Sequence, residues 1–257
     1  MMHVDPNWWK RLFDEHYLLT DARSVCDEAL TRREVGLLEA HLHLKKDERI
    51  LDLCGGHGRH SLELARRGYR DLTVVDYSGF LLQHGKRRAD RGRLPVRFVR
   101  SDARWLGCAA ARFDCVLILA NSFGYFLDDR ENLRVLQEVR RVCRPRGRVL
   151  LDLLDREQVV RRFRPFSCHR VAGGMAVTRE RERNNTLARV RETVLAGSGR
   201  VVREGAYCER LFTERDLASL LAAGGFSRFE LYRDFSGHQG TGDCGFMNSR
   251  VIVTARP

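Results

Sequence analysis

The sequence has few lysines and prolines and no long hydrophobic run. Of its 257 residues only four are lysine and five are proline. No uncharged apolar stretch of about eighteen residues occurs, which excludes a transmembrane helix, and the first residues lack the basic and apolar regions of a secretion signal. We therefore expect a soluble, cytoplasmic protein. With 43% hydrophobic and 31% charged residues, the chain is neither disordered nor collagen-like.

The charge is strongly basic but evenly spread. Lysine and arginine number 46 against 34 acidic residues, a formal net charge of +12 that suggests a nucleic acid or another anionic partner. Nearly all of this charge is arginine interleaved with Asp and Glu, whereas nucleic-acid footprints cluster on one face. We therefore expect a compositional bias and keep RNA as the alternative partner. The eight cysteines are scattered singly, which favours reduced core thiols over disulfides.

Hydrophobic periodicity predicts two N-terminal helices within residues 1–45 and an α/β arrangement after them. Short apolar runs alternate with polar helical segments, which is typical of a parallel sheet with helices on both faces. The expected strands are 50–53, 72–75, 96–99, 115–119 and 149–154. The expected helices between them are 59–67, 80–91 and 130–142, the last stopped by Pro145.

Beyond residue 164 the pattern changes from helical to alternating. Segments 171–183, 186–195 and 201–212 predict an inserted antiparallel sheet of three strands, separated by turn-forming Asn and Gly residues. A capping box at 213–216 then predicts a helix, and strands at 229–235 and 250–254 close the chain. We divide the chain into an N-terminal helical region (1–45), a sheet domain (46–164 and 213–257) and an inserted sheet (165–212).

A glycine-rich turn follows the first buried strand and precedes a helix. Gly55, Gly56 and Gly58 allow the backbone to approach a ligand closely, and the helix start offers free N–H groups to an anion. Asp76 ends the next apolar run, where a carboxylate can accept both hydroxyl groups of a ribose. Together these features predict a site for an adenosine-type nucleotide.

The details of the turn argue against a dinucleotide. Ser61 stands where the dinucleotide pattern G-x-G-x-x-G prefers a third glycine or alanine, and Asp52 lies within the first strand. Cys54, His57 and His60 have a spacing that would bind zinc only if a fourth ligand approached, and we expect no metal site.

Residues 51–58 resemble the first motif of class I S-adenosylmethionine (SAM)-dependent methyltransferases. Four further segments are similar to the later motifs of that family and occur in the same order, at 74–78, 100–103, 113–116 and 144–152. The resemblance covers about residues 46–155. It implies a Rossmann-like, doubly wound sheet of seven strands with the last strand antiparallel, and SAM bound across the carboxyl ends of the first strands. Departures are Gly55 where Cys is usual and Arg146 where Gly is usual.

The resemblance also implies the residues that bind the cofactor. Asp76 would bind the ribose, Asp102 and Ala103 the adenine edge, and Arg32 the methionine carboxylate. The full expected set is Tyr17, Arg32, Asp52, Cys54, Gly55, Gly56, Gly58, Asp76, Tyr77, Asp102, Ala103 and Asn121. In related enzymes the N-terminal region closes over the cofactor, so we expect residues 1–45 to form a lid.

Residues 119–125 resemble the corresponding segment of glycine and sarcosine N-methyltransferases, which carry additional antiparallel strands over the acceptor. We therefore expect methyl transfer to a heteroatom of a small molecule, with nitrogen preferred. The acceptor-pocket candidates are Asn121, Tyr125, Tyr207 and His238. No catalytic residue is named, because in-line displacement at an already activated sulfonium depends mainly on alignment of the acceptor. An RNA methyltransferase and a non-catalytic SAM-binding module are the alternatives.

Overall fold

Seven strands form the larger sheet in a computed structural model that describes residues 2–235 and 250–257. They are β1 (Arg49–Leu53), β2 (Asp71–Asp76), β3 (Val96–Arg100), β4 (Phe113–Ile118), β5 (Cys143–Leu154), β10 (Arg228–Phe235) and β11 (Arg250–Arg256). Their order across the sheet is β10-β11-β5-β4-β1-β2-β3. The pairs among β1 to β5 are parallel, and β11 runs antiparallel to both β5 and β10. The expected doubly wound sheet with an antiparallel last strand is confirmed.

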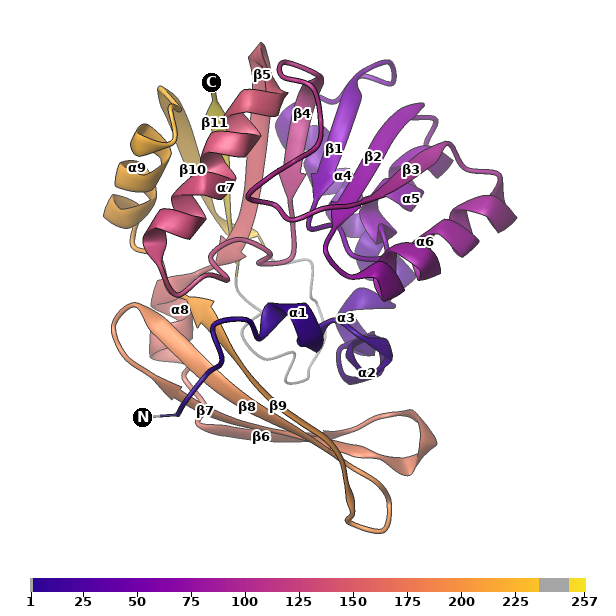
Figure 1. Ribbon diagram of the computed structural model, residues 1–257, viewed down its shortest axis with the longest axis vertical. Coiled ribbons are helices and arrows are strands. Elements are labelled where there is room, and N and C mark those ends of the chain that lie inside the picture. The colour runs from indigo at the N-terminus through magenta and orange to yellow at the C-terminus, as the bar shows by residue number, and fades with distance from the viewer. Residues whose placement is uncertain (1, 236–249) are drawn as a thin grey trace.

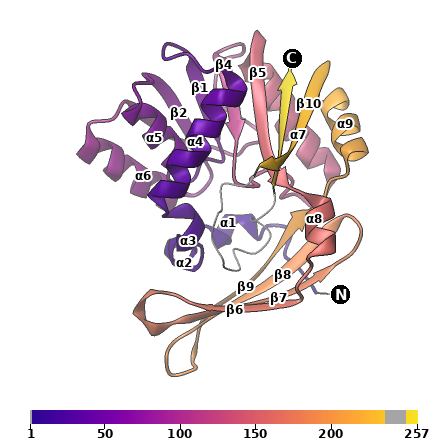
Figure 2. The ribbon, with the colours of Figure 1, turned by 180° about the vertical axis from the view of Figure 1, so that it is seen from behind.

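Helices cover both faces of this sheet (Figures 1 and 2). On one face α4 (Glu28–Leu42) and α5 (Arg59–Arg66) bury side chains such as Leu38 and Leu64 against the strands. On the opposite face α7 (Asp129–Val142) and α9 (Glu214–Ala223) bury Leu136 and Leu221. Helix α6 (Gly79–Gly92) connects β2 to β3. Burial of each of these leucines contributes about 1.5–3 kcal/mol to the free energy of folding. The helices on both faces therefore stabilise the sheet that supports the loops.

The inserted sheet has four strands rather than the expected three. These are β6 (Phe166–Arg170), β7 (Ala176–Arg183), β8 (Leu187–Leu195) and β9 (Val201–Arg210), which pair antiparallel in that order. The additional strand, β6, is a five-residue edge strand with no buried side chain, so its sequence carries little hydrophobic signal. The segment β6 to β9 follows α8 (Arg156–Arg161) and lies across from the carboxyl edge of the larger sheet (Figure 1).

The N-terminal region forms four helices where two were expected. They are α1 (Trp9–Leu12), α2 (Glu15–Thr20), α3 (Ala22–Val25) and the long α4. Aspartates cause the breaks: the Asp14 carboxylate accepts N–H bonds at the start of α2, and Asp27 does the same for α4. Helix α1 lies between the two sheets (Figures 1 and 2). This placement brings the N-terminal aromatic residues to the edge where the glycine turn emerges.

Two boundary predictions differ in outcome. The capping box is confirmed, because the Thr213 side chain accepts from Asp216 N–H and the Asp216 side chain accepts from Thr213 N–H. Helix α7 ends at Val142, as expected, but β5 begins at once and runs through Pro145. In the described part of the chain no helix is long and apolar enough to cross a membrane.

A buried network of charges ties the N-terminal helices to the sheet. The guanidinium of Arg250, on β11, donates to Glu34 of α4 and to Asp152 of β5, the latter at 2.6 Å. Glu34 also accepts from Arg59 and, at 2.9 Å, from His60. Burial alone would raise the pKa of Glu34, but Arg59 and its other partners outweigh burial and hold that pKa far below its usual range. The carboxylate therefore stays ionised inside the protein.

Replacing Arg250 with methionine should destabilise the fold by about 3 kcal/mol, because removing one member of a buried ion pair leaves an uncompensated charge. Asp152 is the residue most affected, since burial already raises its pKa to about 6 and Arg250 is the main group that opposes this rise. Urea unfolding measures the effect. Lys86→Met is the control, because its pair with Asp90 is exposed and should change stability by no more than about 0.5 kcal/mol. Equal losses in both variants would contradict the assignment.

Candidate functional site

The glycine turn holds a conformation that requires its glycines. Gly56 has φ +58°, a left-handed conformation that glycine adopts at little cost. Gly55 is confined by close approach, because a Cβ there would lie 2.7 Å from Cγ of Asp52. Gly58 caps α5 and packs against Phe98 of β3. The turn therefore presents bare backbone to the space above β1.

Asp76 organises this turn from the neighbouring strand. Its Oδ2 accepts from Gly56 N–H at 2.8 Å, and its Oδ1 accepts from Ser78 N–H at 2.8 Å. Each oxygen keeps a further lone pair, so the carboxylate can still accept hydroxyl groups. Burial raises the pKa of Asp76, whereas the backbone hydrogen bonds lower it. The side chain thus fixes the turn and remains able to bind a ribose.

Asp52 contributes a buried oxygen without a partner. Its Oδ2 accepts from the Ser61 hydroxyl at 2.8 Å, while Oδ1 has no hydrogen bond to any described residue. Burial raises the pKa of Asp52 to about 6. A buried acceptor without a donor is costly, so this atom fits a ligand that brings one.

A pocket opens over these residues, and we call it the glycine-turn pocket. It encloses about 1030 Å³, open solvent at its mouth included. Its walls include most of the expected cofactor residues, namely Tyr17, Asp52, Cys54, Gly55, Gly56, Asp76, Tyr77, Asp102 and Ala103. Folding therefore gathers side chains from α2 and from the carboxyl ends of β1, β2 and β3 into one cavity.

Asp102 is already engaged in this pocket. It accepts from Arg104 Nε at 3.0 Å and from Arg104 Nη2 at 2.7 Å. Burial alone would raise the pKa of Asp102, but the Arg104 bonds outweigh it and hold the pKa below its usual value. An adenine amino group at this position would have to share the carboxylate with Arg104.

A second pocket adjoins the first on the side of the inserted sheet, and we call it the sheet-side pocket. It encloses about 710 Å³, open solvent included. Three acceptor candidates line it: Asn121, Tyr125 and Tyr207. The fourth, His238, lies outside the described residues. Asn121 was also expected to contact the cofactor, but the structure places it in the walls of the sheet-side pocket alone.

The structure does not bring Arg32 to either pocket. Its side chain is 56% exposed on α4, and its Nη1 lies 3.9 Å from Glu28 Oε2. The buried face of α4 carries Thr31 and Glu34 instead, which hold the guanidinium of Arg59. Arg59 lines both pockets, and sequence reasoning missed it although it directly follows the last glycine of the turn.

The N-terminal aromatic residues form part of the pocket walls. The Trp9 ring lies 4.8 Å from that of Tyr77, and Phe13 stacks on Tyr125 at 5.7 Å, centroid to centroid. Trp8 packs against Tyr125 at 4.9 Å. Helix α1 and the residues after it therefore cover the pockets with apolar surface.

The imidazoles of the glycine turn are engaged elsewhere. His57 Nε2 lies 3.1 Å from the Val25 carbonyl oxygen, and His60 bonds to Glu34. Burial lowers the pKa of His57 to about 3 and that of His60 to about 4. Both rings are therefore neutral at physiological pH and serve to dock the N-terminal helices.

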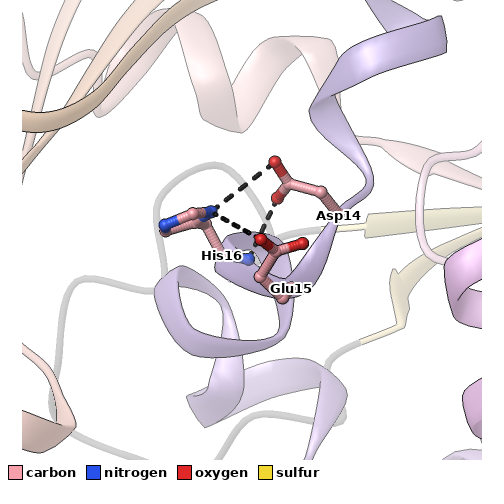
Figure 3. Close-up of side chains that lie close together, drawn as sticks. All are labelled: Asp14, Glu15 and His16. Atoms are coloured by element: carbon pink, nitrogen blue, oxygen red, sulfur yellow. Dashed lines mark hydrogen bonds and ion pairs between the residues drawn. The ribbon is translucent and has the colours of Figure 1, made fainter.

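Figure 3 shows a separate group of potential metal ligands, Asp14, Glu15 and His16. His16 Nδ1 lies 3.6 Å from Asp14 Oδ2 and 3.9 Å from Glu15 Oε1. Asp14 already caps α2, accepting from His16 and Tyr17 N–H groups, and its Oδ2 lies 3.5 Å from Arg203 Nε. Helix capping accounts for this arrangement without a metal.

Comparison with known proteins identifies the sheet domain. Residues 50–147 match the family described as methyltransferase domain. This segment of the chain is a methyltransferase domain. The chain is 35% identical over 151 residues to a demethylmenaquinone methyltransferase of Beutenbergia cavernae, covering 57% of this chain and 58% of that protein. It is 32% identical over 109 residues to a glycine/sarcosine N-methyltransferase of Halorhodospira halochloris, covering 40% and 39%.

Solved structures share the fold over nearly the whole chain. An S-adenosylmethionine-dependent methyltransferase from Clostridium acetobutylicum aligns with a TM-score of 0.71 and 15% identity, over 94% of this chain and 96% of that one. The sugar N-methyltransferase KedS8 from Streptoalloteichus sp. aligns with a TM-score of 0.67 and 20% identity, over 100% and 96%. The glycine turn, Asp76 and the unpartnered Asp52 oxygen fit SAM, the cofactor named for the Clostridium acetobutylicum protein.

Replacing Asp76 with alanine should weaken binding of S-adenosylhomocysteine by about 1.5–3 kcal/mol, because a charged acceptor of the ribose hydroxyls is lost. Titration calorimetry measures this change. Asp71→Ala is the matched control, since Asp71 opens the same strand at the far end and pairs with Arg49 and Arg97 on the surface. Unchanged affinity in Asp76→Ala would show that the carboxylate serves only to hold the turn.

Proposed function

We propose that this protein transfers the methyl group of SAM to a nitrogen atom of a small-molecule acceptor. The observation that carries the proposal is the direct adjacency of the two pockets. They share the walls formed by Phe13, Tyr17, Val25, Arg59, Ala120 and Tyr125. A donor in the glycine-turn pocket and an acceptor in the sheet-side pocket would therefore meet without crossing solvent.

The chain's own part in the reaction is binding, alignment and exclusion of water. When bound, SAM supplies a methyl group on a sulfonium, whose leaving group is already activated. Asp76 and the glycine turn would hold the ribose. Asp52 would accept a hydrogen bond from a donor group at the methionine end of SAM. We assign residues 1–45 as the lid, because Trp8, Trp9 and Phe13 supply the apolar cover. Such cover aligns the reactants and keeps water away from the transfer.

Two relatives of different kinds support nitrogen as the atom that accepts the methyl group. The Halorhodospira halochloris protein is named for N-methyl transfer to glycine and sarcosine, and KedS8 for N-methyl transfer to a sugar. The sheet-side pocket is walled by residues of the inserted sheet and of α1, and it opens beside the glycine-turn pocket. Asn121, Tyr125 and Tyr207 are the side chains that we propose to contact the acceptor.

We further propose that Arg59 binds the methionine carboxylate of SAM in place of Arg32. Its Nη1 donates to Thr31 Oγ1 at 3.0 Å and to Glu34, while Nε and Nη2 hold no hydrogen bond to a described residue. Arg59 is buried yet lines the glycine-turn pocket, so these donors can bind an anion there. A charge-assisted bond of this kind is stronger than a neutral one.

The variant Arg59→Lys should weaken the binding of SAM by about 1.5–3 kcal/mol. Lysine keeps the positive charge beside Glu34 but lacks the second and third donor nitrogens of arginine. Decarboxylated SAM should lose much less affinity, since it has no carboxylate. Calorimetry with both ligands separates these effects. Arg32→Ala is the control and should alter neither affinity. Equal losses for the two ligands in Arg59→Lys would remove Arg59 from the carboxylate site.

The activity itself is tested by turnover with methyl-labelled SAM across amines, phenols, sugars and total RNA. We expect label in amines, at rates that change little between low and moderate salt. RNA methylation that falls steeply with salt would favour the alternative acceptor, because phosphate contacts release counterions. SAM binding without any labelled product would leave only a binding module.

A further inference from the structure

Carboxylates are the main charged groups in the walls of the sheet-side pocket. Its walls contain four carboxylates, Asp21, Glu34, Glu192 and Glu209. Within the described residues the one basic side chain in these walls is Arg59, which is paired with Glu34. Any of these carboxylates that is not already paired with an arginine favours a cationic occupant over an anionic one.

Three of the four carboxylates already have cationic partners. Glu34 belongs to the buried network that includes Arg59. Asp21 accepts from Arg179 Nη2 at 2.9 and 3.0 Å, and Glu192 accepts from Arg179 Nε at 2.8 Å and from Arg203 Nη1 at 3.0 Å. These ion pairs fasten β7, β8 and β9 to one another and to the N-terminal helices.

Glu209 is the exception. Its Oε2 is buried and holds no hydrogen bond to any described residue. Glu209 and Tyr207 are two residues apart on β9, opposite Ala188 and Val190 of β8, so both side chains project from the same face of the sheet. Both line the sheet-side pocket. An unpartnered carboxylate oxygen therefore accompanies an aromatic ring in the acceptor cavity.

The surroundings of Glu209 place the ionisation of its carboxyl group near neutral pH. Burial raises the pKa of Glu209 to about 7, and this is the dominant effect; Arg181 and Arg179 of β7 lower it, and Asp21 raises it. Tyr125, across the pocket, is also close enough for its own pKa to respond to Glu209. A cation bound beside the carboxylate would favour the ionised form further.

Aromatic rings surround this carboxylate on the N-terminal side. The Trp8 ring lies 5.8 Å from that of Tyr207 and 4.9 Å from that of Tyr125, and Phe13 stacks on Tyr125. All four rings line the sheet-side pocket. Aromatic faces attract ammonium groups as well as apolar surface, by about 0.5–2 kcal/mol for each well-placed contact.

We propose that the acceptor is a small amine without a carboxylate group, and that Glu209 binds its ammonium group within the aromatic walls of the sheet-side pocket. This inference rests on the proposed methyl transfer and names the substrate class of the same site. An α-amino acid is disfavoured, because the one described basic side chain of these walls, Arg59, is assigned to Glu34 and to the methionine carboxylate of SAM.

The same carboxylate can accept the proton that methylation requires the amine to lose. The ammonium group gives a proton to Glu209, which leaves a neutral amine and a protonated carboxyl group. The nitrogen lone pair then forms the new C–N bond, the C–S bond breaks, and its electron pair remains on sulfur, which becomes a neutral thioether. The product is a methylated ammonium ion. Glu209 returns its proton to solvent when the product leaves.

The test compares amines with their parent amino acids, which differ by one carboxylate. Suitable pairs are phenethylamine with phenylalanine, tyramine with tyrosine, and histamine with histidine, with 4-ethylphenol as a neutral acceptor. We expect kcat/KM for at least one amine to exceed that of its parent by at least about tenfold. In Glu209→Gln this value should fall by about 10- to 100-fold, as for a lost bond to a charged group.

Glu204→Gln is the matched control, because Glu204 lies on the same strand but is exposed on the opposite face. It should leave turnover unchanged, and both variants should bind S-adenosylhomocysteine as the unaltered protein does. The pH profile adds a readout that a purely structural role would not move. Activity of the unaltered protein should rise through about pH 7 as Glu209 ionises, and Glu209→Gln should lack this rise.

The outcomes separate this inference from the proposed function. Equal use of amines and amino acids, or an unchanged pH profile in Glu209→Gln, overturns the role of Glu209. Methylation of 4-ethylphenol without methylation of any amine overturns the amine acceptor while methyl transfer itself stands. SAM binding with no methylated acceptor at all contradicts the proposed function.

Discussion

The ionised carboxylate of Glu34 holds together parts of the chain that lie far apart in the sequence. It accepts from Arg59 and His60 of α5 and from Arg250 of β11, so one buried charge joins the N-terminal helices, the glycine turn and the last strand. Arg250 extends the network to Asp152, whose Oδ2 accepts from the Ala120 N–H at 2.9 Å. Both pockets depend on this network, because Arg59 and Ala120 are among their shared walls.

Much of the larger sheet and of the glycine-turn pocket could be predicted from local sequence. Buried parallel strands read as short apolar runs, and the glycine turn and Asp76 occupy fixed positions after two of them. The inserted sheet was harder to define. Strand β6 has no buried side chain and was missed, and the aspartates that divide the N-terminal region were interpreted as part of two longer helices.

The residues that sequence reasoning missed are those whose role depends on tertiary pairing. The sequence around Arg32 and Arg33 does not show which of the neighbouring side chains faces the protein interior. Helix α4 places both arginines on its exposed face and Glu34 on its buried face. Arg59 becomes a site residue only because Glu34 and Thr31 orient it. Glu209 differs from its acidic neighbours because its Oε2 holds no hydrogen bond to a described residue, which no local sequence pattern reveals. The arginine-rich composition likewise reflects internal pairing, as in Arg148 with Glu48 and Arg179 with Glu192.

The N-terminal helices line both pockets at once, through Phe13 and Tyr17. Any shift of this segment on filling one cavity therefore alters the walls of the other. In thermodynamic terms, the affinities of donor and acceptor are linked, and the linkage acts equally in both directions. If the first ligand orders the segment, the second binds without that entropic cost, so donor and acceptor would bind with positive cooperativity whichever binds first.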